Sequence, residues 1–404
     1  MRLAGRALAL AAAGLAAACG GLKMPAMPSL PAMTPSPTGD ASEVAPPARP
    51  VAAASAPAAT APKPATPAAW REPAALSAAQ EKTAIEHIER IRATRPAANP
   101  KEAEQFNKQL EDAWKFFLAH PGSIAPIRRA LSREMTQRPP NHFVLLDLGY
   151  YLHTHGSPAD RELAKSALFT LDPAAPIMRF NLQELFQFTH VVAASRDERV
   201  LEFIERAFLR KQVAVEIPES KVTLDPTLAT AWLYGAYGDG AEARLASLLR
   251  TPVTDKPLAR KVLEVLTWIG SPASNPQVKN VLIGASRDAD TFMRTATFLM
   301  NVGGPQGRAV VLAVQPDGLD LWTASYFERI REPARATSFA SLSRPLTQDA
   351  SLKKVLDADR PRAELIAQLD ADRTRIFRLA PTKERVAEAQ RVNLAINAIR
   401  YRDS

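Results

Sequence analysis

The chain has 404 residues, of which 46% are apolar, 6% aromatic and 23% charged. Glycine is scarce, at 17 residues, while alanine and leucine are abundant, so the composition favours helices and argues against an all-β fold. The net charge of +9 arises from 51 basic and 42 acidic residues spread along the chain. A nucleic-acid-binding protein usually gathers its basic residues on one face, so we expect no nucleic-acid partner.

The only cysteine, Cys19, follows a signal-peptide pattern at the start of the chain. Arg2 and Arg6 form a basic beginning, and residues 7–18 consist of alanine, leucine and one glycine. This apolar run is shorter than the ~20 residues that a membrane-spanning helix needs. We therefore expect residues 1–18 to be a cleaved signal peptide. A single cysteine also rules out a disulfide within the chain and a cysteine-based site elsewhere.

The segment Leu15-Ala16-Ala17-Ala18-Cys19-Gly20 resembles the lipobox of bacterial lipoproteins, in which small residues precede a cysteine. The resemblance implies cleavage before Cys19, lipidation of Cys19 and stable membrane anchoring by several acyl chains. Ala16 departs from the pattern, which prefers leucine at that position. Gly20 stands where enteric-type lipoproteins retained in the inner membrane carry aspartate, which implies an outer-membrane address facing the periplasm. An ordinary secretory signal cut at an Ala-x-Ala site is the alternative.

Residues 19–73 are predicted to form a disordered, lipid-anchored linker rich in proline and alanine. Residues 22–73 hold 13 of the 34 prolines of the chain and show neither a helical nor a strand period. Frequent proline removes amide donors and disfavours helix in the residue before it. At ~3.1 Å per residue, a fully extended linker of this length reaches on the order of 150 Å. It can therefore hold the rest of the protein well away from a membrane surface.

Residues 74–404 are predicted to form an α-helical body, and its first two helices have clear start signals. Ser77 and Gln80 have the spacing of a capping box, and Ile85, Ile88 and Ile91 follow on one face. Asn99-Pro100 opens the next helix. Its apolar stripe is Phe106, Leu110, Ala113 and Phe117.

Further helices are predicted along the chain from the same signals. Ser157-Pro158 and Asp225-Pro226 each begin one, and Ser195 with Glu198 reads as a capping box for another. Later helices are expected at residues 257–269, 276–285, 289–302, 319–331, 361–379 and 383–401. One stretch differs: in residues 212–224, apolar side chains alternate on both sides of Pro218, which predicts a small β-hairpin or an extended loop.

A weak repeat links the later helices. Residues 265–272 (VLTWIGSP) resemble residues 298–305 (FLMNVGGP) at an offset of 33, and Asp255 then pairs with Asp288. Gly156-Ser157-Pro158 ends a helix in a similar way, with glycine expected in the left-handed position. The pattern resembles HEAT-type repeats, over residues 255–315 in particular. The predicted fold is therefore all-α, an α-solenoid of HEAT-like helical hairpins, with an irregular helical bundle as the alternative.

The sequence carries no convincing catalytic constellation. His142, His153, His155 and His190 could bind a metal, but His153 and His155 are two apart on a helix, where side chains point in different directions. Glu219-Ser220 matches the Glu-Ser dipeptide of lytic transglycosylases, but the family's Gly-Leu-Met-Gln motif is absent and Glu219 lies in a loop. Gly235, Gly238 and Gly240 follow no strand and are expected to separate two helices. No cofactor, metal or small-molecule ligand is predicted.

These features favour an outer-membrane-anchored lipoprotein whose helical body is a protein-interaction or scaffolding module of the cell envelope, without enzymatic activity. Its expected partners are the membrane, through the lipid on Cys19, and a protein of the envelope. Two alternatives remain open: an envelope hydrolase that acts on peptidoglycan, and a structural subunit of an envelope machine. A pocket lined by glutamate and histidine residues with perturbed pKa values would favour the hydrolase.

Overall fold

The computed structural model describes residues 70–95, 99–175, 181–211, 213–217, 220–249, 255–284, 288–314 and 361–400, and single positions between 320 and 331. The predicted signal peptide, Cys19 and nearly all of the predicted linker lie outside the described residues. Most of the expected helix at 319–331 does so too, although its described positions 321, 323–325, 327–328 and 331 are helical.

The described part of the chain is mostly helical, as predicted. Its helices in chain order are α2 (Ala78–Ala93), α3 (Pro100–Ala119), α4 (Ile124–Met135), α5 (His142–His155), α6 (Pro158–Thr170), α7 (Leu182–Ala194), α8 (Arg199–Ile204), α9 (Pro226–Tyr237), α10 (Ala241–Ser247), α11 (Lys256–Ile269), α12 (Asn275–Gly284), α13 (Ala289–Asn301), α14 (Gly304–Ala313), α18 (Arg362–Phe377) and α19 (Lys383–Arg400). Short helical turns η1 (Pro121–Ser123), η3 (Glu205–Leu209) and η5 (Pro272–Ser274) join some of them, of which η3 is a π-helix.

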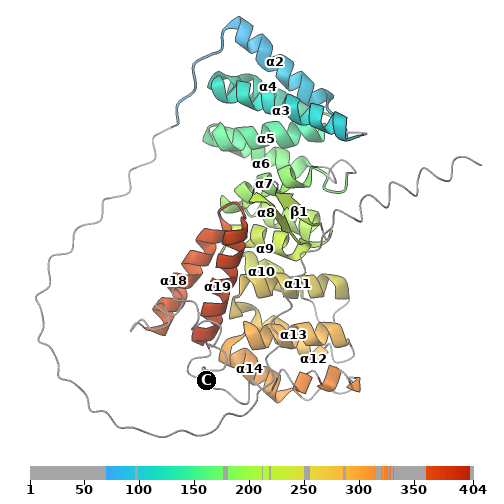
Figure 1. Ribbon diagram of the computed structural model, residues 1–404, viewed down its shortest axis with the longest axis vertical. Helices are drawn as coiled ribbons and strands as arrows, with labels where there is room; N and C mark the ends of the chain where they lie inside the picture. The colour runs from blue at the N-terminus through green and yellow to red at the C-terminus, as the bar shows by residue number, and fades with distance from the viewer. Residues whose placement is uncertain are drawn as a thin grey trace, which may run out of the picture. The chain divides into compact units, whose positions relative to one another are not determined.

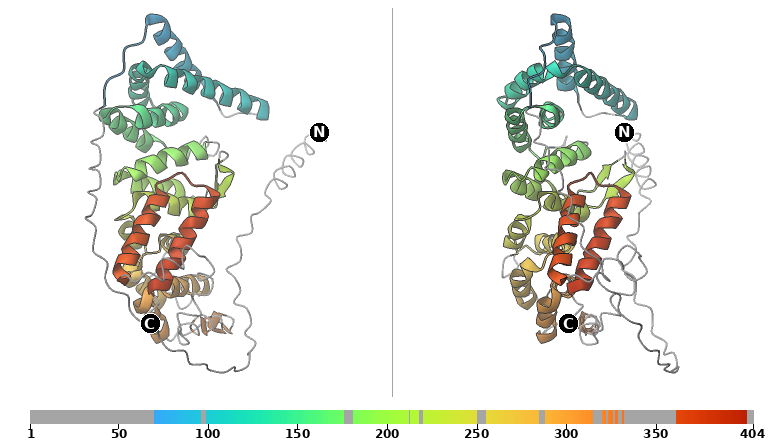
Figure 2. Two further views of the ribbon diagram at one scale, coloured as in Figure 1. Left: turned by 60° about the vertical axis from the view of Figure 1, so that its left-hand side comes forward. Right: turned by 90° about the vertical axis from the view of Figure 1, so that its left-hand side faces the viewer.

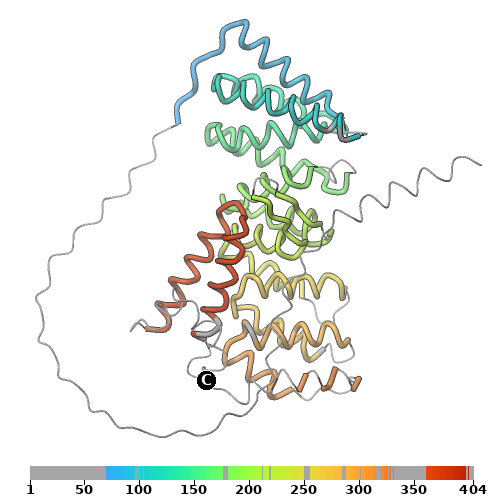
Figure 3. Tube along the Cα trace, viewed as in Figure 1, coloured from blue at the N-terminus to red at the C-terminus, as the bar shows by residue number. Residues whose placement is uncertain are grey.

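The helices from α4 to α14 stack in two layers (Figures 1 and 3). One layer holds α5, α7, α9, α11 and α13, each packed on the next. The other holds α4, α6 and α8, followed by α10, α12 and α14. This alternation of helices between two layers is the arrangement of an α-solenoid, because a helical hairpin buries its apolar face only against its neighbours.

The predicted β-hairpin is present. Strands β1 (Val215–Ile217) and β2 (Val222–Leu224) pair antiparallel, with Val215 opposite Leu224. The apolar side chains of both strands are buried, whereas Glu216 and Thr223 face solvent. β1 packs on α7 and β2 on α9, which gives this short sheet the support that an isolated hairpin lacks.

The C-terminal hairpin α18–α19 returns to the middle of the stack. Figures 1 and 2 show both helices running across the stacked helices rather than parallel to them. α18 packs on α9, where the Phe377 ring lies against the backbone of Gly235 and edge-on to Trp232. A β-carbon at position 235 would approach the Phe377 ring to 2.5 Å, so this helix crossing requires glycine.

The body begins with residues that belong to the predicted linker. Trp70 packs on the hydrophobic core, as does Leu76 just after the predicted linker, and Glu72 forms an ion pair with Arg128 at 3.4 Å. The capping box of Ser77 and Gln80 then starts α2, as predicted. Ile88 and Ile91 are buried as expected, but Ile85 is 44% exposed, because the buried face of α2 passes through Ala84 and His87 instead.

One expected helix start differs from the structure. Ser195 does not begin α8; it ends α7, where its hydroxyl donates to the Val192 carbonyl at 2.7 Å. Arg196, with a φ of 60°, breaks the helix, and the Asp197 carboxylate accepts the amide of Arg199 at the start of α8. The polar residue that stabilises this start therefore lies two positions after Ser195.

The three glycines of the repeat pattern play different roles. Gly270 ends α11 with a φ of 70°, as predicted. Gly156 is extended instead, and Gly303 has a φ of −65°. At both of these positions a β-carbon would lie within 2.6 Å of a carbonyl oxygen, that of Leu152 or Leu299. Crowding, rather than a left-handed backbone, accounts for glycine there.

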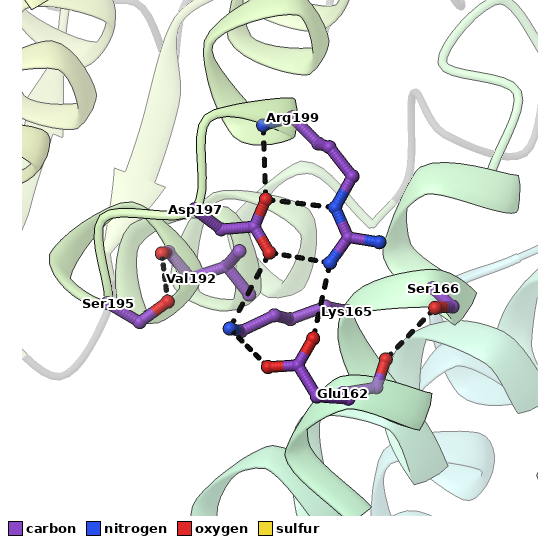
Figure 4. A network of polar contacts seen from close by, with 7 residues as sticks. All are labelled: Glu162, Lys165, Ser166, Val192, Ser195, Asp197 and Arg199. Carbon is purple, nitrogen blue, oxygen red and sulfur yellow. Dashed lines mark hydrogen bonds and ion pairs between the residues drawn. The ribbon is translucent and has the colours of Figure 1, made fainter. Parts of the chain in front are cut away.

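Groups of ion-paired side chains, which we call polar joints, connect neighbouring helical hairpins at several levels of the stack. Figure 4 shows one, in which Lys165 of α6 contacts both Glu162 and Asp197, and Arg199 contacts the same two carboxylates. Asp255 and Asp288, which the repeat pattern pairs, both stand before a helix. Each contacts an arginine that precedes it in the chain, Arg210 at 3.8 Å and Arg260 at 3.2 Å.

Replacing Asp197 with alanine is expected to lower the free energy of unfolding by about 1–2 kcal/mol. Its side chain is 10% exposed and accepts hydrogen bonds from the Arg199 amide and guanidinium, so its loss removes a helix start and leaves Lys165 without one of its two partners. Urea denaturation followed by circular dichroism measures the change. Asp239→Ala is the matched control: that side chain is 91% exposed, so we expect a change below about 0.5 kcal/mol. Equal losses in both variants would contradict the role of the joint.

Candidate functional site

A surface pocket of about 200 Å³ lies where α3, α5 and α7 meet. Each helix contributes side chains one turn apart: Leu110 and Trp114 from α3, Leu146, Asp147 and Tyr150 from α5, and Glu184 and Gln187 from α7. Residues three or four apart lie on the same side of a helix, so each helix turns one strip of its surface to the pocket. All these side chains are half-buried except Leu146, which is buried, so the pocket is open to solvent.

Two aromatic rings form one wall of the pocket. The centroids of the Trp114 and Tyr150 rings are 5.9 Å apart, with 51° between the ring planes. Trp114 also packs against Tyr151, whose ring lies edge-on with the ring centroids 5.2 Å apart. Tyr151 is buried, and its hydroxyl donates to the Phe117 carbonyl at 2.9 Å. The indole of Trp114 is thereby fixed between a rigid buried ring and the open pocket.

Asp147 places a carboxyl group in the pocket with no polar partner. Within the described residues, no hydrogen bond or ion pair reaches it. Burial, followed by the negative charge of the nearby Glu184 carboxylate, raises the pKa of Asp147 to about 8. Asp147 is therefore mostly a neutral carboxyl group at pH 7, and a cation that enters the pocket would stabilise its charged form.

Glu184 supplies the second acidic group, from the first turn of α7. The partial positive charge at a helix N-terminus stabilises a carboxylate in this position. Gln187, one turn further along α7, adds an amide that can both donate and accept hydrogen bonds. The pocket therefore combines two acidic groups and an amide with aromatic and aliphatic walls.

The histidines do not meet at this pocket or at any common point. His142 begins α5, whereas His153 and His155 lie near its other end. The ring of His153 faces Phe188 and that of His155 faces Tyr151, so the two point apart as the helical spacing predicts. His190 is buried in α7, and its Nε2 lies 2.7 Å from the Phe377 carbonyl.

Lowering the pH below 6.5 is expected to destabilise the body through His153. Burial, followed by the charges of Lys165 and Arg161, lowers the pKa of His153 to about 4. Between pH 6.5 and 4 the unfolded chain therefore binds a proton at His153 that the folded chain does not bind. The free energy of unfolding falls as the pH is lowered through this range, by about 1–2 kcal/mol in total. Denaturation of the wild type and of His153→Gln at pH 8, 7, 6 and 5 tests this. The difference between their free energies of unfolding should be constant from pH 8 to 7 and should shrink towards pH 5. A constant difference at every pH would contradict the role of His153.

The remaining sequence predictions give no second site. Among the described residues, no three His, Cys, Asp or Glu side chains are grouped as metal ligands. Glu219 and Cys19 lie outside the described residues. Gly238 and Gly240, with φ of 84° and 96°, separate α9 from α10 as expected, whereas Gly235 lies inside α9.

The pocket was not predicted from the sequence, although one residue in α5 points to it. Asp147 is the only charged residue in the run Phe143–Tyr151, which is otherwise almost entirely apolar and mostly buried. Charged residues are rarely buried without a partner, so a single charged residue in such a helix indicates a polar site nearby. Its partners could not be found in this way, because Trp114 and Glu184 come from other helices, more than thirty residues away in either direction.

No helix in the described ranges is long and apolar enough to cross a membrane. Comparisons with protein-family models, with curated proteins and with solved structures found no match to this chain. We therefore infer the function from the residues of the chain and from the geometry of the stacked helices.

Proposed function

We propose that this chain is a lipoprotein of the bacterial cell envelope, anchored in the outer membrane through Cys19, whose helical body binds a protein partner on the periplasmic side. The lipobox-like segment around Cys19 supports the anchor, and the proline-rich residues 22–73 support a long linker. The body is a non-enzymatic interaction module in this proposal.

The observation that carries the proposal is the two-layered stack of helices from α4 to α14. In such a stack each hairpin contacts mainly its neighbours, so the helices of one layer present a continuous surface. Surfaces of this kind suit extended protein or peptide partners. The open pocket between α3, α5 and α7 provides a defined point of attachment on that surface.

Labelling with a palmitate analogue tests the anchor. We expect the wild-type chain to carry the label and to sediment with outer membranes, and we expect Cys19→Ala to lose the label. Because that change also removes the cleavage site, the variant should keep residues 1–18, which mass spectrometry detects. An unlabelled wild-type chain that begins after residue 18 and stays soluble would favour an ordinary secretory signal instead.

A peptidoglycan hydrolase is the second candidate, and the pair of acidic groups in the pocket favours it. Glycoside hydrolases use two carboxyl groups, one of which has a raised pKa, as Asp147 does. At about 200 Å³, however, the pocket is smaller than the roughly 300–1,000 Å³ of typical ligand sites, and it offers little room for a sugar chain. Incubation with purified cell wall discriminates: release of glycan fragments by the wild type but not by Asp147→Asn would establish the hydrolase.

A further inference from the structure

We infer that the pocket formed by α3, α5 and α7 binds one basic side chain, a guanidinium or an ammonium group, that a protein partner presents. The inference rests on the proposed function, since it names the chemistry by which the body recognises its partner. It follows from the size of the pocket, its walls and its charge.

The size of the pocket fits a single side chain. Its volume is about 200 Å³, below the range of sites for whole small molecules. The half-buried Trp114, Asp147, Tyr150 and Gln187 surround an opening towards solvent, so a side chain can enter from outside. The occupant is therefore one residue of a partner rather than a free cofactor.

The walls suit the stem and the head of a long basic side chain. Leu110 and Leu146 offer apolar surface to its methylene groups, and Trp114 and Tyr150 line the pocket with aromatic rings, a residue type whose faces attract cations. Cation–π contacts with tryptophan contribute about 0.5–2 kcal/mol, depending on how far the cation is desolvated. An uncharged aliphatic side chain would pack against these walls but would make no favourable contact with the acidic groups.

The acidic groups select a cation, because a cation beside Asp147 favours its carboxylate form and releases the proton that the free chain holds. Asp147 has no hydrogen bond or ion pair within the described part of the chain, and Glu184 lies on the opposite helix. A guanidinium can donate several hydrogen bonds at once, which would satisfy Asp147 and contact Glu184 and the Gln187 side-chain oxygen as well. A bare metal ion fits less well, because the described residues supply no third acidic or imidazole ligand there, and hard cations take six or more oxygen ligands.

Ligand titrations on the full-length chain test the inference. The probes are N-acetyl-arginine amide and N-acetyl-lysine amide, and N-acetyl-citrulline amide serves as the neutral control of nearly the same shape as arginine. Binding is followed by NMR of the indole signals, with Trp114→Phe used to assign the signal of Trp114 among the five tryptophans. We expect the arginine probe to shift the Trp114 signal and to bind about tenfold more tightly than the citrulline probe, a difference of about 1.4 kcal/mol.

The variants make the test specific. Asp147→Asn and Glu184→Gln should each weaken binding of the arginine probe by about tenfold. Asp112→Asn removes an exposed carboxylate of α3 outside the pocket and should leave binding unchanged. Circular dichroism confirms that each variant is folded. Equal binding of arginine and citrulline probes, or equal binding by wild type and Asp147→Asn, would overturn the inference.

This experiment separates the inference from the proposed function. If the probes fail but an envelope protein is cross-linked to the body, the scaffold proposal stands and the pocket inference falls. If the probes bind as expected but no envelope protein is found, the pocket stands and the scaffold proposal falls. Release of cell-wall fragments that depends on Asp147 would overturn both in favour of the hydrolase.

Discussion

Trp232→Ala is expected to lower the free energy of unfolding by about 3–5 kcal/mol, the largest loss we predict for a single substitution. The Trp232 side chain is fully buried in α9. Its ring meets the Phe377 ring edge-on, with centroids 5.0 Å apart, and its indole N–H donates to the Leu379 carbonyl at 3.0 Å. The substitution therefore removes both the packing and the hydrogen bond that hold the C-terminal hairpin on the stack.

Two measurements check this prediction. Urea denaturation gives the overall loss, and hydrogen exchange shows where it falls, because a stack of repeats can open locally. We expect the amides of α18 and α19 to exchange much faster in Trp232→Ala, while those of α4 and α5 change little. Trp232→Phe keeps most of the ring but not the N–H donor, so about 1 kcal/mol should be lost. Unchanged exchange in α18 would contradict the role of Trp232 in docking the hairpin.

Asp147→Asn is expected to stabilise the protein at pH 7 by about 1–3 kcal/mol. The pKa of Asp147 is about 8 in the folded chain, and it is near 3.8 when unperturbed. Between these values the folded chain holds a proton that the unfolded chain releases, so Asp147 costs more stability as the pH rises. Asparagine does not titrate, and the predicted gain should disappear towards pH 4. The full shift corresponds to more energy, but the side chain is only half-buried and water weakens the effect.

Denaturation of the wild type and of Asp147→Asn from pH 4 to pH 8 measures this gain. Asp112→Asn, which is exposed on α3, should show no gain at any pH. A destabilised Asp147→Asn would mean that the carboxylate has a structural partner. If Asp147→Asn is more stable but no longer binds the arginine probe, Asp147 lowers the stability of the free chain and is needed for binding.

Local signals in the sequence predicted the helices well, because a helix start is fixed by residues close in the chain. The carboxylate of Asp225 and the amide oxygen of Asn99 each accept a backbone amide three residues on, as their Asp-Pro and Asn-Pro patterns predict. The alternation in residues 212–224 likewise gave the β-hairpin. Ser195 misled the prediction because two polar residues, Ser195 and Asp197, compete for the same helix start.

Contacts between distant residues could not be predicted. His190 and Phe377 are 187 positions apart, and Trp232 and Leu379 are 147 apart, yet both pairs fix the C-terminal hairpin. A helical period shows that a face is buried but not against which partner. For the same reason the pocket could not be predicted, because its side chains come from three helices that are distant in the sequence. The sequence indicated only that Asp147 is unusual in its apolar helix.

In the function that we propose, the body holds a protein partner through the pocket while Cys19 anchors the chain in the envelope. The most direct measurement is site-specific photo-cross-linking in living cells, with a photoreactive residue in place of Gln187 at the pocket or of Leu394, which is 53% exposed on α19. We expect one defined envelope protein to be cross-linked from position 187 through a segment that contains arginine or lysine. We expect no such product from position 394, and loss of the product in Asp147→Asn. The same products from both positions, or none from position 187, would contradict it.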